Sequence, residues 1–511
     1  MVEARKIAGN TIALMTGKLI RLVIAMVLGV VLVRYLGPFH LGNWKVALSA
    51  AELLTILSAM GIGKIAIREC ASRRDEIGRY LGTIWSLKLI FGLISFLAAL
   101  IIVRGLGYHA EIAHLLFVAL GIYILTSLGE TFIIRFRTRE KMGYEALANI
   151  SKDLFLMFAI FLAIYLGWGI LRIAYLYLAG AVFYLIVSWV IADRKLPPLQ
   201  LSLDLKLSRH LLMAGLPLGL AVFFNAYHDA SRLIIQQTIG SAGAGYYSAA
   251  VLLYLALEST VVLSLMGSLF PILSRYHASN NRGLIELYRR MSRYLYIISL
   301  LSAVFCLFLG DEIILLLFNP AYGDSIPVLK LLGPVMILMF QNYLLYNAMV
   351  ASHREKLFAL VMGGSALINA GGIFLLSGLI GGGGSVSVVV PLTGISLFTI
   401  RLIRLTAAPA ALAAAQIFSF IIFSRILRRE YGEGILHNRW VRPAAAAVIS
   451  GLLIWFESRL DFPLGVIAAS SVIVYVAALV IFRGIDAGDL QLLKNLFSGW
   501  ISFLSPDKKG Q

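Results

Sequence analysis

The chain has 511 residues, of which 60% are hydrophobic and only 14% are charged, and its formal net charge is +18. Soluble globular proteins are about 45–50% apolar and about 25% charged, so this composition excludes an ordinary soluble domain and favours a protein surrounded by lipid. The basic residues lie in short connections between apolar runs, where anionic lipid headgroups explain them better than nucleic acid does.

Apolar runs recur along the whole chain. A transmembrane helix needs roughly 20 mostly apolar residues, and backbone groups in hydrocarbon require helical pairing. The first run follows Arg5 and Lys6, but it is longer than a signal sequence and no small-residue cleavage site follows it, so we expect an uncleaved span. The predicted spans are 10–33, 43–63, 81–103, 111–133, 153–169, 172–191, 212–239, 246–270, 294–317, 327–350, 358–379, 406–424, 443–457 and 464–482.

Most of the 44 lysine and arginine residues fall in the connections on one side of these spans. Because basic connections stay in the cytoplasm, both termini are predicted to be cytoplasmic and the number of spans even, about 14. The connections on the opposite side contain only Arg34, Arg104, Arg172, Arg401, Arg404 and Arg459. The segment 381–405 is apolar but would reverse this orientation as a span, so it is interpreted as an external loop, a re-entrant piece or an interfacial piece.

The chain contains signs of an internal duplication. Leu36-Gly37, four residues and Gly42-Asn43-Trp44 recur as Ile239-Gly240, four residues and Gly245-Tyr246-Tyr247, an offset of 203 residues. Repeats of this kind form two lobes with a site between them. We therefore predict an all-α polytopic membrane protein of two pseudo-symmetric six-helix lobes plus two C-terminal helices. The predicted boundaries are 1–197 for the first lobe, 205–430 for the second, 438–485 for the last two spans and 486–511 for a cytoplasmic tail.

The first span carries Lys18 and Arg21, three residues apart. Lys18 could reach the headgroups by extending its side chain towards the interface. Arg21 lies a turn deeper, where its guanidinium suits a phosphate or pyrophosphate that accepts two parallel hydrogen bonds.

Three carboxylates are candidates for coupling transport to H⁺ or Na⁺. Glu52 shares one face of the second span with Lys45 and Ser49, and Glu258 lies near the middle of the eighth span. The 203-residue offset puts these two carboxylates at nearly equivalent places, where burial would raise their pKa. Equally, each could simply neutralise a nearby cation. The third, Asp229, belongs to the seventh span.

The seventh span carries the strongest polar constellation. Asn225, Asp229, Arg232 and Gln236 are spaced i, i+4, i+7 and i+11, which places them on one helix face. Such a stripe is expensive in lipid, so it predicts a polar cavity wall. The alternative is a helix seam held by an internal pair between Asp229 and Arg232.

The tenth span carries neutral hydrogen-bonding side chains. Gln341, Asn342 and Asn347 could hold sugar hydroxyls, or they could pack one helix against another. Signals for catalysis and cofactors are missing from the sequence. It lacks a phosphate-binding loop, a metalloprotease motif and a nucleophile elbow, and the spacing of Cys70 and Cys306 suggests neither a disulfide nor a metal site. We therefore expect no enzyme activity, no cofactor and no metal.

Several segments in order resemble the Wzx/RfbX-type polysaccharide flippases, relatives of the multidrug exporters (MATE) and the lipid II flippases of the MOP superfamily. They are Tyr35-Leu36-Gly37-Pro38, Asp229 with Arg232 and Gly240, Phe270-Pro271-Ile272-Leu273-Ser274-Arg275, and Leu316 to Tyr322 followed by Pro327 to Leu332. The resemblance covers the chain to about residue 375 and departs at 381–405. It implies 12 to 14 helices, two lobes with alternating access, and a basic central cavity lined by Arg21 and Arg232.

These observations predict a flippase for a polyprenyl-(pyro)phosphate-linked oligosaccharide in the cytoplasmic membrane, working with membrane lipids and glycan-assembly proteins and without nucleic acid. The predicted substrate contacts are Lys18, Arg21, Asn225, Arg232, Gln236, Gln341 and Asn342, and the predicted ion-coupling residues are Glu52, Asp229 and Glu258. The alternatives are a cation-coupled multidrug exporter, which would have more acids and aromatics in its cavity, and a membrane-embedded glycosyltransferase or polymerase, which would have external loops rich in carboxylates.

Overall fold

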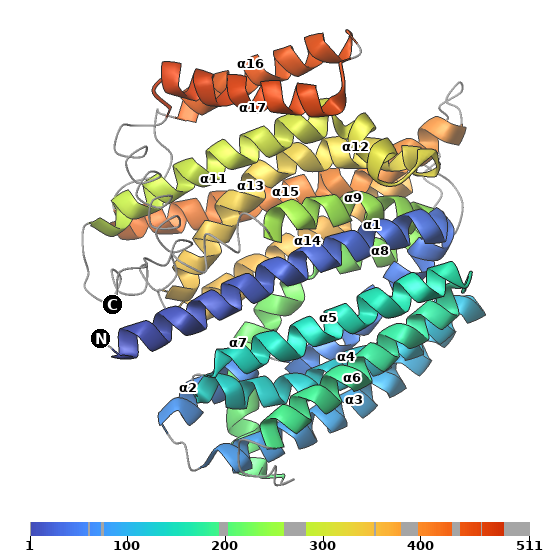
Figure 1. Cartoon of the computed structure of the whole chain (residues 1–511), viewed down its shortest axis with the longest axis vertical. Helices are drawn as coiled ribbons and strands as arrows, with labels where there is room; N and C mark the ends of the chain where they lie inside the picture. The colour runs from blue at the N-terminus through green and yellow to red at the C-terminus, as the bar shows by residue number, and fades with distance from the viewer. Residues whose placement is uncertain are drawn as a thin grey trace, which may run out of the picture.

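The computed structural model shows an all-helical bundle (Figure 1). The described residues are 2–59, 62–72, 76–139, 141–193, 203–259, 283–351, 354–379, 397–431, 440–460 and 462–484. Among them, 11 helical segments are long and apolar enough to cross a membrane. The predicted fold class is confirmed, while the total of 14 spans stays a prediction.

The first bundle is built from α1 to α6. Within it α4 packs against α1, α3 and α6, and α5 packs against α1 and α6. The helices are α1 (Val2–Ala59), α2 (Ile62–Ser72), α3 (Ile77–Leu106), α4 (Ala110–Thr138), α5 (Met142–Tyr165) and α6 (Ile170–Asp193).

The second bundle is built from α7 to α15 and, apart from α7, lies above the first in Figure 1. Its core is formed by α13, which packs against α11 and α15, and by α14, which packs against α7 and α15. The elements are α7 (Leu205–Asn225), α8 (Tyr227–Thr238), α9 (Ser241–Glu258), α11 (Gly283–Phe308), α12 (Gly310–Leu317), the 3-10 helix η3 (Pro320–Ser325), α13 (Ile326–Ala351), α14 (Glu355–Leu379) and α15 (Leu397–Tyr431).

Two further helices, α16 (Val441–Ser458) and α17 (Leu464–Ile481), pair with each other at the edge of the second bundle and pack mainly on α11 (Figure 1). The Arg442 guanidinium at the start of α16 donates to the Arg483 carbonyl just after α17. The end of α17 therefore lies beside the start of α16, as expected for a membrane hairpin.

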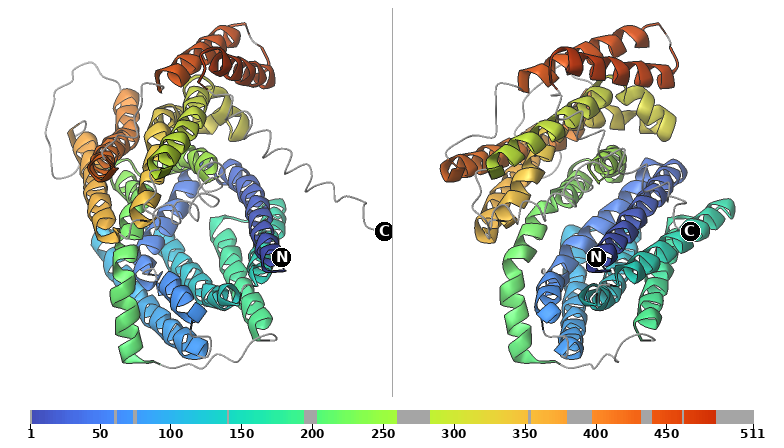
Figure 2. Two further views of the ribbon diagram at one scale, coloured as in Figure 1. Left: turned by 90° about the vertical axis from the view of Figure 1, so that its left-hand side faces the viewer. Right: turned by 60° about the vertical axis from the view of Figure 1, so that its left-hand side comes forward.

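Helix α1 contains both of the first two predicted spans. Its apolar stretch Thr16–Ile56 has 41 residues, which at 1.5 Å per residue is about 60 Å, roughly twice the hydrocarbon thickness. The chain reverses at Gly37, whose backbone is not helical (φ 67°, ψ 170°) and which precedes Pro38. Figure 2 shows the two halves of α1 side by side.

The predicted seventh span is not one helix. It is divided at Ala226 (φ −78°, ψ 40°) into α7 and α8. Helix α7 packs on α2 and α3 of the first bundle and on α14 of the second, and α8 packs on α1 of the first bundle and on α9 and α14 of the second. This arrangement lets α7 pass from one bundle to the other (Figure 2).

The loop interpretation of 381–405 is wrong for its last nine residues. Residues 397–405 form the beginning of α15, which continues without interruption through Pro409. Residues 381–396 lie outside the described part of the chain, so the re-entrant and interfacial alternatives for them, and the domain boundaries, stay predictions.

The duplicated hairpins of the two bundles contact each other reciprocally. A Cβ atom on Gly42 would lie 1.8 Å from the carbonyl oxygen of Ser241, and one on Gly245 would lie 1.9 Å from that of Pro38. Adding the 203-residue offset to Pro38 and Gly42 gives Ser241 and Gly245, so each contact is the counterpart of the other. Such a self-complementary contact is what two copies related by a twofold axis form. Only glycine permits this approach.

Candidate functional site

A cluster of charged side chains lies where the second half of α1 meets α8. We call it the α1/α8 cluster; its members are Lys45, Ser49, Glu52, Asp229 and Arg232. Arg232 Nη1 donates to Asp229 Oδ1 at 2.5 Å and to Ser49 Oγ at 3.1 Å. The Ser49 hydroxyl in turn donates to Asp229 Oδ1 at 2.8 Å. The cluster therefore joins the two bundles by hydrogen bonds between side chains.

The local sequence explains this arrangement. Lys45, Ser49 and Glu52 follow the i, i+4, i+7 spacing, so they share the face of α1 that meets α8. Asp229 lies in the first turn of α8, where the helix dipole favours a carboxylate. Arg232 follows it by three residues, close enough for an ion pair on the same helix.

A third helix contributes a group that the sequence did not indicate. The Tyr123 hydroxyl on α4 donates to Glu52 Oε2 at 2.8 Å. A tyrosine within an apolar span has many structural uses, so nothing in the sequence marks this one. The hydrogen bond fixes the position of the Glu52 carboxylate within the cluster.

Charges in the cluster balance, with two cations against two carboxylates. Asp229 is paired with Arg232, whereas Lys45 makes no hydrogen bond or ion pair with any other described residue. The Nε atom of Arg232 is buried and has no hydrogen-bond partner in the described part of the chain. A buried donor of this kind costs free energy until it finds an acceptor. The cluster thus has capacity for a further anion.

The predicted four-residue stripe is only partly correct. Asn225 ends α7 on the other side of the break at Ala226 from Asp229, Arg232 and Gln236, so the four do not share one helix face. The Asn225 side chain lies outside the described residues. Gln236 donates to Ser241 Oγ at 3.2 Å, within the second bundle. The internal pair between Asp229 and Arg232, the alternative interpretation, is present.

Arg21 has a carboxylate partner in the structure. Its Nε atom lies 2.7 Å from Asp153 Oδ2 on α5, and Lys152 Nζ lies 3.7 Å from the other oxygen of the same carboxylate. Two cations thus share one anion, and Lys18 is exposed one turn away on α1. The group is net positive and partly open, which suits an anionic ligand. Asp153 was not identified from the sequence as the partner of Arg21, although the cost of an arginine within a span implies that a partner exists.

Glu258 lies at the C-terminal end of α9 and is partly buried. It makes no ion pair with another described residue, so the described part of the chain offers no support for a purely neutralising role. Its counterpart Glu52 is held by Tyr123. The two carboxylates therefore have different surroundings despite their nearly equivalent positions in the duplication.

Gln341 and Asn342 make the helix-packing contacts of the alternative interpretation, and their binding of sugar hydroxyls stays a prediction. Both are almost completely buried. Gln341 accepts from Ser292 Oγ at 2.6 Å and donates to the Ser292 carbonyl at 3.0 Å, and Asn342 donates to the Gln416 side chain at 2.6 Å. These amides join α13 to α11 and α15, because a buried amide in an apolar interface must find partners.

In the described residues, no three or more histidine, cysteine or acidic side chains are grouped as metal ligands. Cys70 and Cys306 are buried free thiols. The chemistry that the charged groups offer is the binding of ions and anionic ligands.

The helical bundles, with charges held between them, define a multi-pass membrane protein of the transporter type. The family model described as "Polysaccharide biosynthesis protein" matches residues 7–277, and the chain belongs to that family. The resemblance to the Wzx-type flippases is thereby confirmed. No curated protein matches the chain.

Solved structures share the fold. The lipid II flippase MurJ in an inward closed conformation is 14% identical and has a TM-score of 0.68, with 94% of this chain and 99% of that chain covered. A multidrug resistance MATE family transporter of the MOP superfamily in an inward-facing conformation is 16% identical with a TM-score of 0.60, covering 81% and 95%. An outward-facing MATE structure is 15% identical with a TM-score of 0.57, covering 83% and 95%.

Proposed function

We propose that the protein is a flippase that moves a polyprenyl-(pyro)phosphate-linked oligosaccharide across the cytoplasmic membrane by alternating access, for the assembly of surface polysaccharide. The observation that supports this proposal most directly is the pair of partly buried cations, Lys45 and Arg232, between the two bundles of a chain from the polysaccharide biosynthesis family. A phosphate-linked sugar cannot cross hydrocarbon unaided, because each buried polar group without partners is costly. Both termini lie in the cytoplasm in this proposal, since most basic residues fall in the connections on their side.

In this mechanism Arg21 with Lys18 and Lys152 receives the phosphate nearer the cytoplasmic, N-terminal end of α1, and Lys45 and Arg232 then hold it deeper in the membrane. The guanidinium of Arg232 exchanges its Asp229 partner for a phosphate oxygen, which accepts charge-assisted hydrogen bonds of the same kind. The reciprocal hairpin contact closes the opposite end until the lobes rotate. Glycan-assembly proteins supply the substrate and receive the product.

Ion coupling is assigned to Glu52, Asp229 or Glu258. When a phosphate binds beside Asp229, the two negative charges repel, and protonation or a bound Na⁺ relieves the repulsion. Replacing each carboxylate by its amide identifies the coupling residue. The amide of the coupling residue uncouples transport from an imposed H⁺ or Na⁺ gradient, whereas the other two amides leave the gradient dependence intact.

The test uses the purified chain in liposomes with a fluorescent polyprenyl-diphosphate sugar, and measures the fraction that becomes accessible on the far leaflet. We expect translocation by the wild type and at least a tenfold loss in Arg232→Ala and Arg21→Ala. Arg137→Ala is the matched control, because Arg137 pairs with Glu145 between α4 and α5, away from the α1/α8 cluster. Normal transport in both variants would contradict the site, and no transport by the wild type would contradict the function.

The multidrug exporter is the competing function, since MATE transporters share the fold. The same liposomes test this alternative with a cationic dye. Export of the dye without movement of the lipid-linked sugar would favour the exporter. The balanced charge of the α1/α8 cluster and the net positive charge around Arg21 argue against a site selective for cations.

A further inference from the structure

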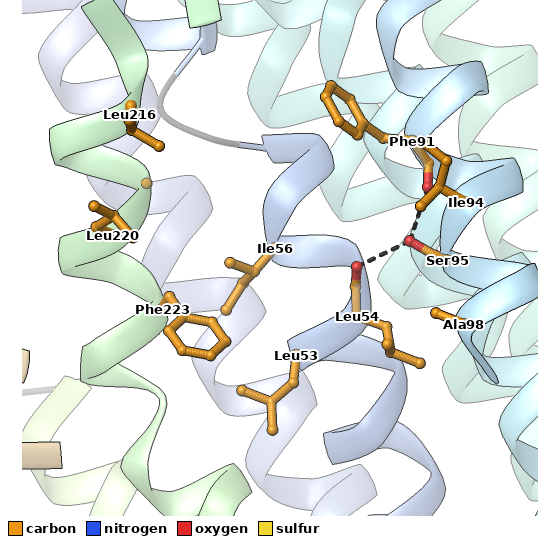
Figure 3. Close-up of a pocket in the computed structure, with 11 residues that line it drawn as sticks. Leu53, Leu54, Ile56, Phe91, Ile94, Ser95, Ala98, Leu216, Leu220 and Phe223 are labelled. Carbon is orange, nitrogen blue, oxygen red and sulfur yellow. Dashed lines mark hydrogen bonds between the residues drawn. The ribbon is translucent and has the colours of Figure 1, made fainter. Parts of the chain in front are cut away.

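An apolar groove lies directly beside the α1/α8 cluster, between α1, α3 and α7 (Figure 3). Its volume is about 260 Å³. Figure 3 shows Leu53 and Ile56 of α1 facing Leu220 and Phe223 of α7, with Phe91 and Ala98 of α3 on the other side.

The described side chains that line the groove offer no free polar group to a ligand. The one hydroxyl among them, that of Ser95, is used within the protein: it donates to the carbonyls of Leu54 and Phe91, each at 2.9 Å. An occupant must therefore be hydrocarbon along the full length of the groove, because a polar group would be left without a partner.

The α1 wall of the groove continues the face that carries the charged residues. Lys45, Ser49, Glu52 and Ile56 are spaced i, i+4, i+7 and i+11, so the face changes from charged to apolar within one turn, about 6 Å along the axis. Leu53, next to Glu52, lines the same groove.

The opposite wall changes its character at the same place. Charged α8 faces α1 on one side of the break at Ala226, and apolar Leu216, Leu220 and Phe223 of α7 face it on the other side. The outer parts of Leu220 and Phe223, and of Ile94 on α3, are exposed, with 38%, 40% and 48% of their surface accessible. In a bilayer such surfaces meet acyl chains, so the groove is open to lipid at its rim.

From this juxtaposition we infer that the groove binds the hydrocarbon chain of the lipid carrier, at the end next to the phosphate, while Lys45 and Arg232 hold the phosphate. The inference rests on the proposed function and adds the place of the carrier chain. An amphiphile with an anionic head and a single linear chain fits two adjacent surfaces of opposite character, whereas a bulk phospholipid carries two acyl chains on its headgroup. The volume of about 260 Å³ accommodates only the first part of a long isoprenoid chain, with the remainder in the bilayer.

The first experiment is photo-crosslinking of the full chain in vesicles of phosphatidylethanolamine and phosphatidylglycerol, with a polyprenyl diphosphate that carries a diazirine near its phosphate. We expect the labels on the groove side chains Phe91, Ile94 and Ala98 of α3 and Leu220 and Phe223 of α7, and we expect excess unlabelled polyprenyl diphosphate to reduce the labelling at least tenfold. Labelling spread over the lipid-facing side chains Leu93 and Leu97, or competition by phosphatidylglycerol to the same extent, would overturn the inference.

The second experiment fills the groove. Ala98→Phe places a ring inside it, and Leu97→Phe places the same ring on the lipid-facing side of the same helix, where Leu97 is exposed. We expect at least a tenfold loss of crosslinking and of translocation in Ala98→Phe and less than a twofold change in Leu97→Phe. Equal effects of the two variants would contradict the binding of the carrier chain in the groove.

The two proposals fail separately. If the groove residues are labelled specifically but the wild type translocates no lipid-linked sugar, the groove assignment is supported and the flippase function is contradicted. If the wild type translocates the sugar and the groove residues are not labelled, only the binding of the carrier chain in the groove is contradicted.

Discussion

Ser49 and Asp229, 180 residues apart in the chain, share a hydrogen bond of 2.8 Å that joins the first bundle to the second. Arg232 donates to both of them, so the three side chains form a closed set. Ser49 is almost fully buried. Any movement that separates α1 from α8 must break this set, which makes it a determinant of the conformation described here.

Removing the Ser49 hydroxyl therefore weakens the contact between the bundles. We expect Ser49→Ala to destabilise this conformation by about 1 kcal/mol, the usual net value of one hydrogen bond, which shifts a two-state equilibrium about fivefold. Spin-label distances between the bundles measure the shift. Thr138→Val is the matched control, because the buried Thr138 hydroxyl donates to the carbonyls of Ile134 and Arg135 in its own helix, α4. Equal shifts in both variants would show that the Ser49 contact has no special role.

A second prediction concerns Gly42 and Gly245, the glycines at the contact between the two hairpins. An added methyl group at Gly42 or Gly245 would overlap a carbonyl oxygen of the opposite hairpin, so Gly42→Ala and Gly245→Ala should force this end of the bundle open. A cysteine at Ala244, which is fully buried, reports the opening through a water-soluble thiol reagent in a background without Cys70 and Cys306. We expect at least tenfold faster labelling.

Gly78→Ala serves as the control for these glycine variants, because a Cβ at Gly78 meets nothing within 4 Å. It should leave the labelling rate unchanged. Slow labelling in the hairpin variants as well would mean that the hairpins tolerate a methyl group, and the close contact would then not hold this end shut.

A charge exchange separates the two roles of Arg21. If Arg21 serves only to pair with Asp153, the double variant Arg21→Asp with Asp153→Arg restores both the folded protein and transport. We expect the exchange to restore thermal stability in detergent to within a few degrees but to leave transport at least tenfold reduced, because a phosphate ligand needs the cation on α1. The same exchange of Arg137 and Glu145, a comparable pair between α4 and α5, should restore both. Restored transport in the Arg21 exchange would contradict its role as a ligand.

Asp204 links the beginning of α7 to the first bundle and gives a pH-dependent prediction. Its carboxylate accepts from the backbone N–H groups of Lys206 and Leu207 and pairs with Arg79 on α3. The Leu207 backbone hydrogen bond, followed by the Arg79 guanidinium, holds the pKa of Asp204 below its ordinary value. Because the folded-state pKa is lowered, the stabilisation is complete above the ordinary pKa of about 4 and is lost as the pH falls through the lowered value.

We therefore expect Asp204→Ala to lower the thermal midpoint at pH 7 more than Asp204→Asn does, since asparagine still caps the helix. The difference between wild type and Asp204→Asn should shrink when unfolding is followed at about pH 3. A difference that stays constant with pH would mean that the charge of Asp204 contributes nothing.

Much of the fold could be predicted because its causes are local. Long apolar runs specify helices in lipid whatever their neighbours are. The repeated glycine pattern also indicated both hairpins, and the structure shows Gly37 and Gly240 with positive φ angles there. The break at Ala226 could not be foreseen from the chain, because alanine favours a helix and the helices that α7 and α8 pack against, α1 and α14, are distant in sequence.

The candidate site was predictable where its partners are close in sequence. Asp229 with Arg232, and Lys45 with Ser49 and Glu52, were visible as helix faces. Contacts between distant segments were not: nothing local pairs Arg21 with Asp153, or Asn342 with Gln416. The groove beside the cluster was invisible for another reason, since its apolar side chains have the same composition as any lipid-facing surface.

The paired glycines also bear on how this chain has been free to change. After an internal duplication most positions of the two halves can take different side chains, because they do not contact their counterparts in the other half. Here Gly42 fits only against the backbone of the second copy and Gly245 only against that of the first. A larger residue at either position disrupts a contact that both hairpins form. Neither hairpin can therefore change at this contact without affecting the other, even where the rest of the two halves differ in sequence.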